Sequence, residues 1–243
     1  EAERVSDKED KIAGALVCLG RMLAVDAPKR ICAFDISNIA GTDIVSSMVV
    51  FVDGRPKKSE YKRFKIRNME DQDDYASMEQ TVTRAFTHYC DGDEKFSEMP
   101  DMILIDGGDR HARVALSALQ QLGISIPIFG MVKDDRHRTR ALVTCDGKEI
   151  AIDTNPAVFS LIGDIQVEAH RFAIGYHRTL RSKRLKYSQL DQIAGIGPKR
   201  KAQLLKTFGS IQAISQATIS DLEQHLPKDA ANAVHMHFHK KGS

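Results

Sequence analysis

Residues 31–36 read ICAFDI and residues 102–106 read MILID, so two short apolar stretches each carry an aspartate at or near their end. Short apolar runs of this kind are typical of strands that are buried inside a sheet. A carboxylate at the end of such a strand protrudes from the sheet edge while the strand keeps it rigid. The two stretches therefore predict a buried sheet with two carboxylates, Asp35 and Asp106, at its edge.

The segments around these stretches complete an α/β pattern. β-Branched residues fill 45–52, and 61–66 alternates apolar and basic side chains, so we expect these segments to form an antiparallel meander with 31–36. Later segments show helical spacing, strand-like apolar runs or a hairpin around Asp146-Gly147. The predicted helices cover residues 8–25, 73–89, 109–122 and 156–176, and the predicted later strands cover 102–105, 126–132, 141–144 and 149–152.

The order of these segments predicts the fold class. Three strands, helix, strand, helix, strand, hairpin and helix is the order of an RNase H-like fold, an α/β mixed sheet flanked by helices. Other α/β folds stay open at this point. After Arg181 the composition changes, because 181–188 is polar and basic and only helical signals follow. We predict an RNase H-like domain over 1–180, a basic linker over 181–188 and a small all-helical domain over 189–241.

The charge distribution points to a polyanionic partner. Net charge is +2, and 42% hydrophobic with 28% charged residues is ordinary for a globular protein. The longest apolar runs are too short to span a bilayer. Residues 171–206, however, hold ten Lys or Arg and a single acidic residue, Asp191. This local excess suits nucleic acid, although a solvated helix face with a basic linker would have the same composition.

The two strand-end aspartates suggest metal chemistry. Carboxylates that lie side by side repel, and a divalent cation such as Mg²⁺ or Mn²⁺ relieves the repulsion. A metal held there can activate water against a phosphodiester. Each aspartate alone is better explained as a strand terminator or helix cap, whereas the pair favours a site. His170 and His177 lie on one face of the same predicted helix and either could complete it.

Residues 193–200 read IAGIGPKR, which is the most specific local motif in the chain. A hydrophobic-x-Gly-hydrophobic-Gly hairpin between two helices exposes backbone N–H groups where a phosphate can dock. Lys199 and Arg200 follow Gly195 and Gly197 after Pro198 and add positive charge. The motif predicts a helix-hairpin-helix that grips a nucleic-acid backbone without reading its sequence. The alternative is a Gly-rich helix connection with no ligand.

With these residues established, the chain resembles the C-terminal half of the UvrC family, the incision subunits of bacterial nucleotide excision repair. The resemblance covers essentially residues 30–225. It implies an RNase H-like endonuclease domain followed by a tandem helix-hairpin-helix domain. The matching motifs are long and in order, and they lie at 34–38, 47–53, 60–64, 73–78, 100–108, 130–138, 168–178 and 195–200.

The resemblance also implies roles for individual residues. Carried over by position, the family's catalytic aspartates fall on Asp35 and Asp106, its helix histidine falls on His170 rather than His177, and a further aspartate associated with activity falls on Asp74. Asp35, Asp106 and His170 would bind Mg²⁺ or Mn²⁺. We infer that a histidine in place of a further carboxylate weakens any second metal. The residues expected to contact DNA are Lys133, Arg171, Arg178, Arg181, Gly195, Gly197, Lys199 and Arg200.

Two stretches depart from the family pattern. Residues 109–111 are Asp-Arg-His where the family usually has Lys-Gly-Gln, which puts a polar contact near the site in doubt. The expected second hairpin reads HLPKDA at 225–230 and lacks glycine. We therefore expect the first hairpin to carry most of the phosphate contact.

The function implied by the resemblance is a 5′ incision beside a lesion in double-stranded DNA. It further implies UvrB and UvrA as partners and a bacterial cytoplasmic location. No segment resembles the family's N-terminal nuclease domain or its UvrB-binding region, so we expect this chain to make at most one cut of the pair. Two rival functions stay open: a non-catalytic DNA-binding scaffold that recruits a nuclease, and a ribonuclease or resolvase with the same core.

Overall fold

The computed structural model describes residues 2–39, 43–66, 73–96, 98–135 and 138–239. Within these ranges, the side chains of residues 2–8, 37–39, 43–44 and 176–189 are not described. The chain divides into two compact units, residues 1–175 and 176–243.

The first unit is built on an eight-stranded mixed sheet, counted over the described residues. Its order is β3-β2-β1-β5-β6-β7-β8, with β4 also paired to β2. Strands β1, β5 and β6 are parallel, whereas the pairs at both ends are antiparallel. The predicted meander, the central strands and the hairpin are thereby confirmed. The strands are β1 (Arg30–Ile39), β2 (Asp43–Val52), β3 (Arg55–Pro56), β4 (Lys62–Lys65), β5 (Met102–Ile105), β6 (Ile128–Lys133), β7 (Thr139–Val143) and β8 (Glu149–Ala151).

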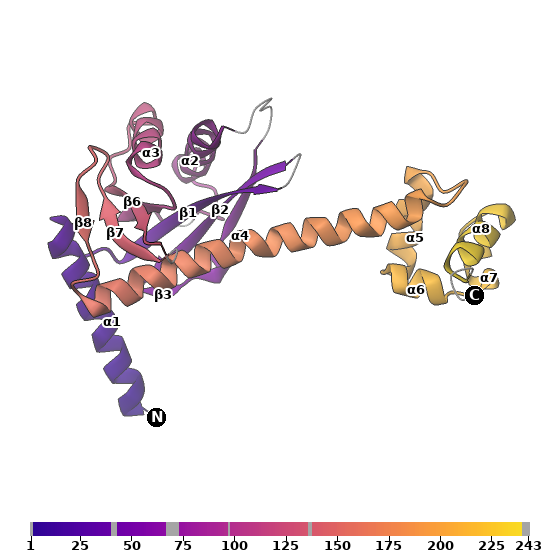
Figure 1. Cartoon of the computed structure of the whole chain (residues 1–243), viewed down its shortest axis with the longest axis horizontal. Helices are drawn as coiled ribbons and strands as arrows, with labels where there is room; N and C mark the ends of the chain where they lie inside the picture. The colour runs from indigo at the N-terminus through magenta and orange to yellow at the C-terminus, as the bar shows by residue number, and fades with distance from the viewer. Residues whose placement is uncertain (1, 40–42, 67–72, 97, 136–137, 240–243) are drawn as a thin grey trace. The chain divides into compact units, whose positions relative to one another are not determined.

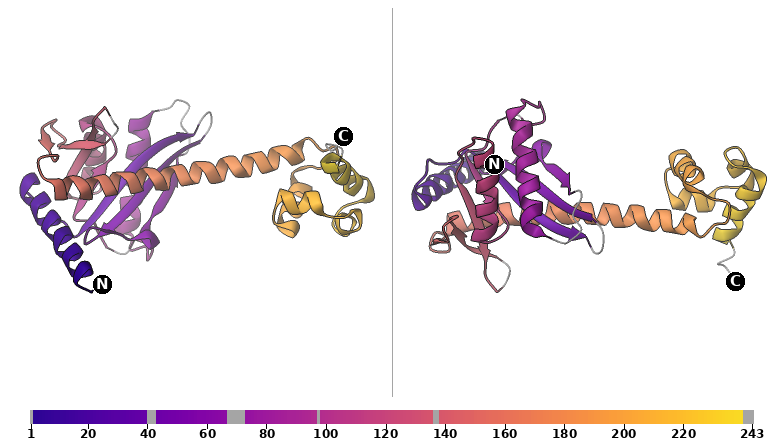
Figure 2. Two further views of the ribbon diagram at one scale, coloured as in Figure 1. Left: turned by 60° about the horizontal axis from the view of Figure 1, so that its bottom comes forward. Right: turned by 90° about the horizontal axis from the view of Figure 1, so that it is seen from above.

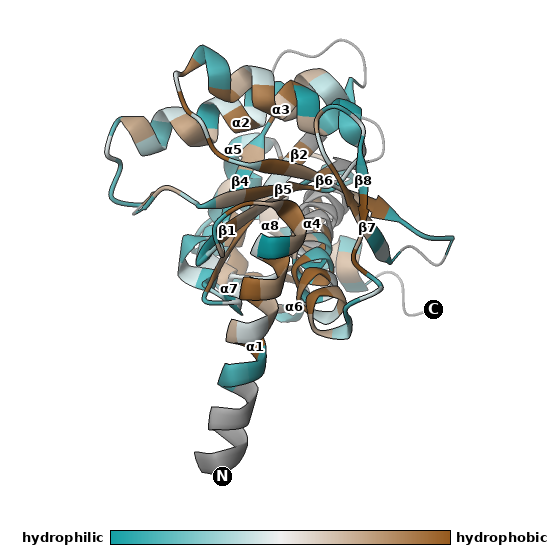
Figure 3. Cartoon of the chain, turned by 90° about the vertical axis from the view of Figure 1, so that its left-hand side faces the viewer, coloured by the Kyte–Doolittle hydropathy of each residue, from teal (hydrophilic) through white to brown (hydrophobic). Residues whose placement is uncertain are grey.

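Helices cover both faces of this sheet (Figures 1 and 2). Helices α1 (Ala2–Leu23) and α4 (Pro156–Asp191) contribute to the apolar core on one face. Helices α2 (Asp74–Cys90) and α3 (Asp109–Gln121) form the core on the other face. Figure 3 shows the apolar residues gathered on the strands between these layers.

The alternation of side chains along a strand explains both cores. In β1, Ile31 and Ala33 belong to the core beneath α1 and α4, whereas Cys32 and Phe34 belong to the core beneath α2 and α3. A strand that is buried on both faces is a nearly continuous apolar run, which is the pattern of residues 31–34. By the same alternation, the next residue, Asp35, faces the side of α1 and α4.

Helix α4 is longer than its sequence predicted. The predicted end near Tyr176 is wrong, because the helix continues to Asp191 and includes residues 181–188, which were expected to form a linker. Residues 176–191 contain neither glycine nor proline, and Lys, Arg, Leu and Gln are good helix formers. A polar and basic composition therefore indicated exposure here rather than an irregular backbone. Among the described helices, none has the length and apolar character needed to cross a membrane.

In the described part of the second unit, all regular secondary structure is helical. Its four helices after α4 agree with the helical signals that follow residue 188 in the sequence. They pack around a small apolar core that includes Leu190, Leu204, Leu222 and Val234. The helices are α5 (Pro198–Phe208), α6 (Ile211–Gln216), α7 (Ile219–Glu223) and α8 (Lys228–His239).

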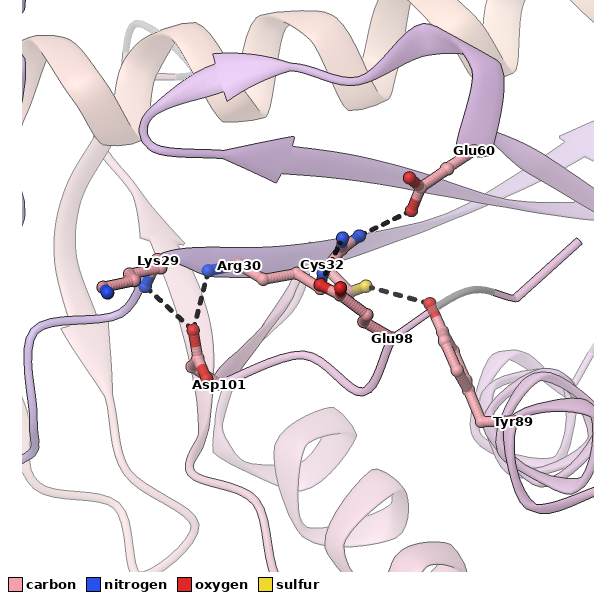
Figure 4. Close-up of polar contacts among 7 residues, drawn as sticks. All are labelled: Lys29, Arg30, Cys32, Glu60, Tyr89, Glu98 and Asp101. Carbon is pink, nitrogen blue, oxygen red and sulfur yellow. Dashed lines mark hydrogen bonds and ion pairs between the residues drawn. The ribbon is translucent and has the colours of Figure 1, made fainter. Parts of the chain in front are cut away.

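A polar network joins the starts of β1 and β5 (Figure 4). One carboxylate oxygen of Asp101 accepts hydrogen bonds from the backbone N–H groups of Lys29 (2.9 Å) and Arg30 (2.8 Å). The buried Arg30 guanidinium forms ion pairs with Glu60 at 2.5 Å and Glu98 at 2.9 Å. The Asp101 N–H also donates to the Arg30 carbonyl at 2.8 Å. These bonds fix the relative register of the two strands that carry Asp35 and Asp106.

Candidate metal centre

Two adjacent parallel strands bring Asp35 and Asp106 together. Phe34 in β1 pairs with Ile105 in β5, so the aspartate that follows each of them lies at the same level. The Asp106 N–H donates to the Phe34 carbonyl at 2.8 Å, which ties the backbone after β5 to β1. Met102 and Leu104 belong to the core beneath α4, and Asp106 continues their alternation. Both carboxylates therefore emerge on the α4 face of the sheet.

Helix α4 supplies a third potential ligand, His170. Its Nδ1 lies 3.5 Å from Oδ2 of Asp35, and one ligand atom from each of Asp35, Asp106 and His170 lies within 4.8 Å of the others. The Asp35 side chain is 4% exposed, whereas the His170 side chain is 59% exposed. The group is thus buried on the sheet side and open on the helix side. The side chain of His177 lies outside the described residues.

Burial and the proximity of two carboxylates make the negative charge at Asp35 unfavourable. Burial raises the pKa of Asp35 to about 6, and the neighbouring negative charge of Asp106 adds to the increase. His170 and Lys133 act in the opposite direction. Oδ2 of Asp35 is buried and has no hydrogen-bond partner among the described residues. Two carboxylates and an imidazole are suitable donors for a divalent cation, which would also satisfy this oxygen.

Lys133 lies beside the group rather than apart from it. Its ammonium nitrogen is 2.9 Å from Oδ2 of Asp106, a hydrogen bond, and 2.7 Å from Oδ1, an ion pair. The pairing of β6 with β7 shifts register between Val132 and Lys133, and such irregularities redirect a side chain. The sequence suggested that Lys133 contacts DNA; the structure gives it a partner inside the site.

Asp74 does not join the group of three. It is the exposed first residue of α2, and the helix is capped by Asp73, whose carboxylate accepts from the N–H groups of Tyr75 and Ala76. Its negative charge acts on the half-buried His111, as does that of Asp106. Burial lowers the pKa of His111 in spite of these two charges. His111 is therefore under the influence of both Asp74 and Asp106, a member of the metal group.

The glycines after Asp106 serve packing more than ligand access. A Cβ at Gly107 would lie 2.7 Å from the His111 ring, so that ring fills the space beside this glycine. The His111 ring centroid also lies 4.5 Å from that of Tyr75. A Cβ at Gly130 would lie 2.4 Å from the Gly107 carbonyl. At Gly108 nothing lies within 4 Å of such an atom, so open space remains there.

Three basic residues of α4 were also expected to contact DNA, and only the side chain of Arg171 is described. Arg171 forms hydrogen bonds of 2.6 and 2.7 Å with Glu168 on its own helix. The side chains of Arg178 and Arg181 lie outside the described residues.

Gln166 was not predicted as a site residue, yet it lies one helical turn before His170 and accepts hydrogen bonds from Thr139. The spacing of four residues on a helix is the signal that could have indicated it.

The glycine hairpin of the second unit has a defined geometry. Gly195 has φ of +82°, a conformation that favours glycine, and Gly197 is the N-cap residue of α5 with Pro198 after it. Gly195, Gly197, Pro198, Lys199 and Arg200 line a surface hollow of about 520 Å³. Arg200 donates to the Gly195 carbonyl at 2.7 Å and so braces the hairpin, whereas Lys199 is exposed.

A family model and the sequences of related proteins point to one family. The model of the UvrC RNase H endonuclease domain matches residues 20–174. The UvrABC system protein C of Caldanaerobacter subterraneus subsp. tengcongensis is 48% identical over 221 residues, covering 86% of this chain and 36% of that protein. The protein of the same name from Thermoanaerobacter sp. (strain X514) is 48% identical over 236 residues, covering 91% and 38%. The chain thus spans little more than a third of these relatives.

A solved structure, human ENDOV, is similar at a TM-score of 0.41 and 10% identity, covering 74% of this chain and 100% of that one. The mixed sheet flanked by helices is consistent with an RNase H-like domain, and the family match covers the residues that bring Asp35, Asp106 and His170 together. The chain therefore belongs to the UvrC family, and residues 20–174 match that family's RNase H endonuclease domain.

Proposed function

We propose that this chain is a divalent-metal-dependent DNA endonuclease that makes the 5′ incision near a lesion in bacterial nucleotide excision repair. The observation that carries the proposal is the convergence of Asp35, Asp106 and His170 within 4.8 Å, in a domain that belongs to the UvrC family. The name of the relatives, UvrABC system protein C, supports the choice of pathway.

Asp35, Asp106 and His170 would hold Mg²⁺ or Mn²⁺. A bound ion would supply a Lewis acid and an activated water for phosphodiester hydrolysis. The chain's own residues provide a rigid, buried carboxylate in Asp35 and an exposed donor in His170, on the side that a DNA strand can reach. Because the third donor is a neutral imidazole rather than a carboxylate, we infer that one ion is held tightly and a second only weakly.

Other residues of the first unit act on this site. Lys133 offsets the charge of Asp106. Asp74 acts on His111, which packs against the Gly107 backbone immediately after Asp106. A change at Asp74 would thus reach the metal group through His111. Arg171, Arg178 and Arg181 would add positive charge along α4 toward DNA.

The second unit would hold the DNA backbone as a tandem helix-hairpin-helix domain. Gly195 and Gly197 leave the hairpin backbone uncovered, and the N-terminus of α5 with the exposed Lys199 favours a phosphate there. The segment at 225–230 has no glycine, so it would mainly pack. The substrate would be damaged double-stranded DNA, the partners UvrB and UvrA, and the location the bacterial cytoplasm.

The substitution Asp35→Ala tests the proposal. We expect it to abolish Mn²⁺-dependent nicking of a lesion-bearing duplex, measured with and without UvrA and UvrB, and to leave duplex binding largely intact. Asp164→Ala is the matched control, because Asp164 is an exposed aspartate on the same helix as His170. A fully active Asp35→Ala protein would exclude the metal assignment.

Two further measurements separate the rival functions. A non-catalytic scaffold would show no Mn²⁺ binding that depends on Asp106, so equal Mn²⁺ titrations of the wild type and Asp106→Asn would favour it. A ribonuclease or resolvase would cut an RNA–DNA hybrid or a four-way junction faster than a lesion-bearing duplex. We expect Mn²⁺ binding to be lost in Asp106→Asn and the lesion-bearing duplex to be the preferred substrate.

A further inference from the structure

The position of His170 depends on its helix. The side chain is 59% exposed, and the contact that links it to the sheet is the 3.5 Å approach of Nδ1 to Asp35. Because most of the His170 side chain is exposed, packing constrains it less than it would a buried side chain. Its distance from the two carboxylates is therefore set by where the backbone of α4 lies over the sheet.

A first polar contact fixes α4 one turn before His170. Oε1 of Gln166 accepts hydrogen bonds from the backbone N–H of Thr139 at 2.9 Å and from its hydroxyl at 2.6 Å. Thr139 is 1% exposed and begins β7, where it pairs with Lys133 of β6. Lys133 in turn contacts Asp106. A chain of contacts thus runs from α4 through two strands to the second carboxylate.

A second contact fixes α4 on the other side of His170. Arg63 of β4 donates to the Phe172 carbonyl at 3.2 Å, and its guanidinium carbon lies 3.9 Å from the centroid of the Phe172 ring. Arg63 pairs with Ser47, and Ser47 pairs with Asp35. Residues that are paired across strands point to the same face, so Arg63 and Asp35 belong to one row beneath α4.

We propose that Gln166 with Thr139, and Arg63 with Phe172, form two clamps that hold α4 on either side of His170 and set the distance of its imidazole from Asp35 and Asp106. These are positioning residues, because they act through His170 and do not touch the reacting atoms. The proposal rests on the proposed function, in which the three side chains bind a metal. It assigns a role to residues that would otherwise only stabilise the fold.

Metal affinity tests the first clamp. Gln166→Met removes the acceptor at similar length, and we expect Mn²⁺ affinity, measured by titration calorimetry, to fall about 10-fold, the low end for residues that orient metal ligands. Gln166→Glu keeps an oxygen acceptor for Thr139 and should restore most of the affinity. Thr139→Val removes one of the two bonds and should give an intermediate loss.

The matched control is Thr81→Val. Thr81 is also buried, and its hydroxyl donates to the Ser77 carbonyl at 2.7 Å, but it lies in α2 on the opposite face of the sheet. The same substitution there should lower the melting temperature without changing Mn²⁺ affinity. Arg63→Met tests the second clamp in the same assay, and DNA is left out so that a lost phosphate contact cannot contribute.

A second readout does not need the metal. In NMR spectra of the metal-free protein, the ring signals of His170, assigned by their loss in His170→Asn, should shift or broaden in Gln166→Met and Arg63→Met. Folded variants with unchanged His170 signals and unchanged Mn²⁺ affinity would overturn the two clamps. If the wild type binds no Mn²⁺ but the signals change, the positioning role stands and the proposed function falls.

Discussion

Lys133 places its ammonium group against both carboxylate oxygens of Asp106, at 2.7 and 2.9 Å. A cation from the protein thus lies at the edge of the group that we propose binds a metal. Its charge offsets part of the repulsion between Asp106 and Asp35, and it lowers the pKa that Asp35 would otherwise have. The same charge repels an incoming metal ion, so Lys133 and the ion compete for Asp106.

This competition predicts that Lys133→Met binds Mn²⁺ more tightly than the wild type. Removing one nearby positive charge should raise the affinity on the order of 10-fold, since charges close to a partly buried site interact by more than 1 kcal/mol. Titration calorimetry at fixed ionic strength measures the change. Lys148→Met, at an exposed lysine of the β7–β8 hairpin, should leave the affinity unchanged. Weaker binding by Lys133→Met would show that the ammonium supports the metal instead.

The raised pKa of Asp35 predicts how stability depends on pH without metal. The folded protein holds this proton with a pKa of about 6, whereas an unfolded aspartate titrates near 4. The folded state therefore binds the extra proton between these values, and the stability of the wild type falls as pH rises from about 4 to 6.

Asp35→Asn removes the charge and should reverse this loss. In EDTA at pH 7.5 we expect the free energy of unfolding of Asp35→Asn to exceed that of the wild type by ~1–3 kcal/mol. The difference should disappear near pH 4, and Mn²⁺ should stabilise the wild type alone. Urea unfolding at the two pH values provides the measurement, with Asp164→Asn as an exposed control. A variant less stable than the wild type at pH 7.5 would contradict the account.

Asp101→Ala should destabilise the first unit at the starts of β1 and β5. It removes the acceptor of two backbone N–H groups, those of Lys29 and Arg30, where the chain enters β1. A buried donor left unsatisfied costs about 1–3 kcal/mol, but the bond from Lys29 is exposed and that from Arg30 is partly buried, so we expect a loss of about 1 kcal/mol in urea unfolding. Asp153→Ala, at an exposed aspartate, should change stability by less than about 0.5 kcal/mol. Equal losses in both variants would argue against the network.

The two hairpin glycines should respond differently to alanine. Gly195→Ala places a Cβ at φ of +82° and should destabilise the second unit by about 1–2 kcal/mol. Gly197 has φ of −80° and open space around it, so Gly197→Ala should fold normally. If a phosphate docks on the hairpin, Gly197→Ala should still weaken duplex binding several-fold in fluorescence anisotropy. Unchanged binding by a folded Gly197→Ala protein would place the DNA contact elsewhere.

The sequence predicted those features that leave a local pattern. Strands buried on both faces appear as apolar runs, so β1, β2, β5 and β6 could be located, and the end of β5 marked Asp106. The prediction that Asp35 ends its strand was wrong, because β1 continues to Ile39 and Asp35 pairs with Ser47 inside it. The prediction that the last helix of the first unit ends near Tyr176 was wrong, because a basic composition indicates solvent exposure, which a helix such as α4 also allows.

Pairings between distant segments could not be read from periodicity. His170 and His177 share a helix face about 10 Å apart along the axis, so only the seating of α4 on the sheet brings His170 to Asp35. The contact of Lys133 with Asp106 and that of Gln166 with Thr139 each join strands or helices far apart in sequence. The type of a basic or amide residue does not indicate which residue it contacts, because that contact depends on the tertiary structure.

The network at Asp101 requires the segments that lead to Asp35 and Asp106 to have matching lengths. Arg30 and Asp101 are joined at one end, and Asp106 is joined to the Phe34 carbonyl at the other. Inserting or deleting one residue between these ties would turn a carboxylate to the α2 and α3 face, away from His170. Residues 31–34 and 102–105 should therefore accept exchange among apolar side chains but no change in length. In related chains, insertions are expected in the turns and never between these two fixed ends.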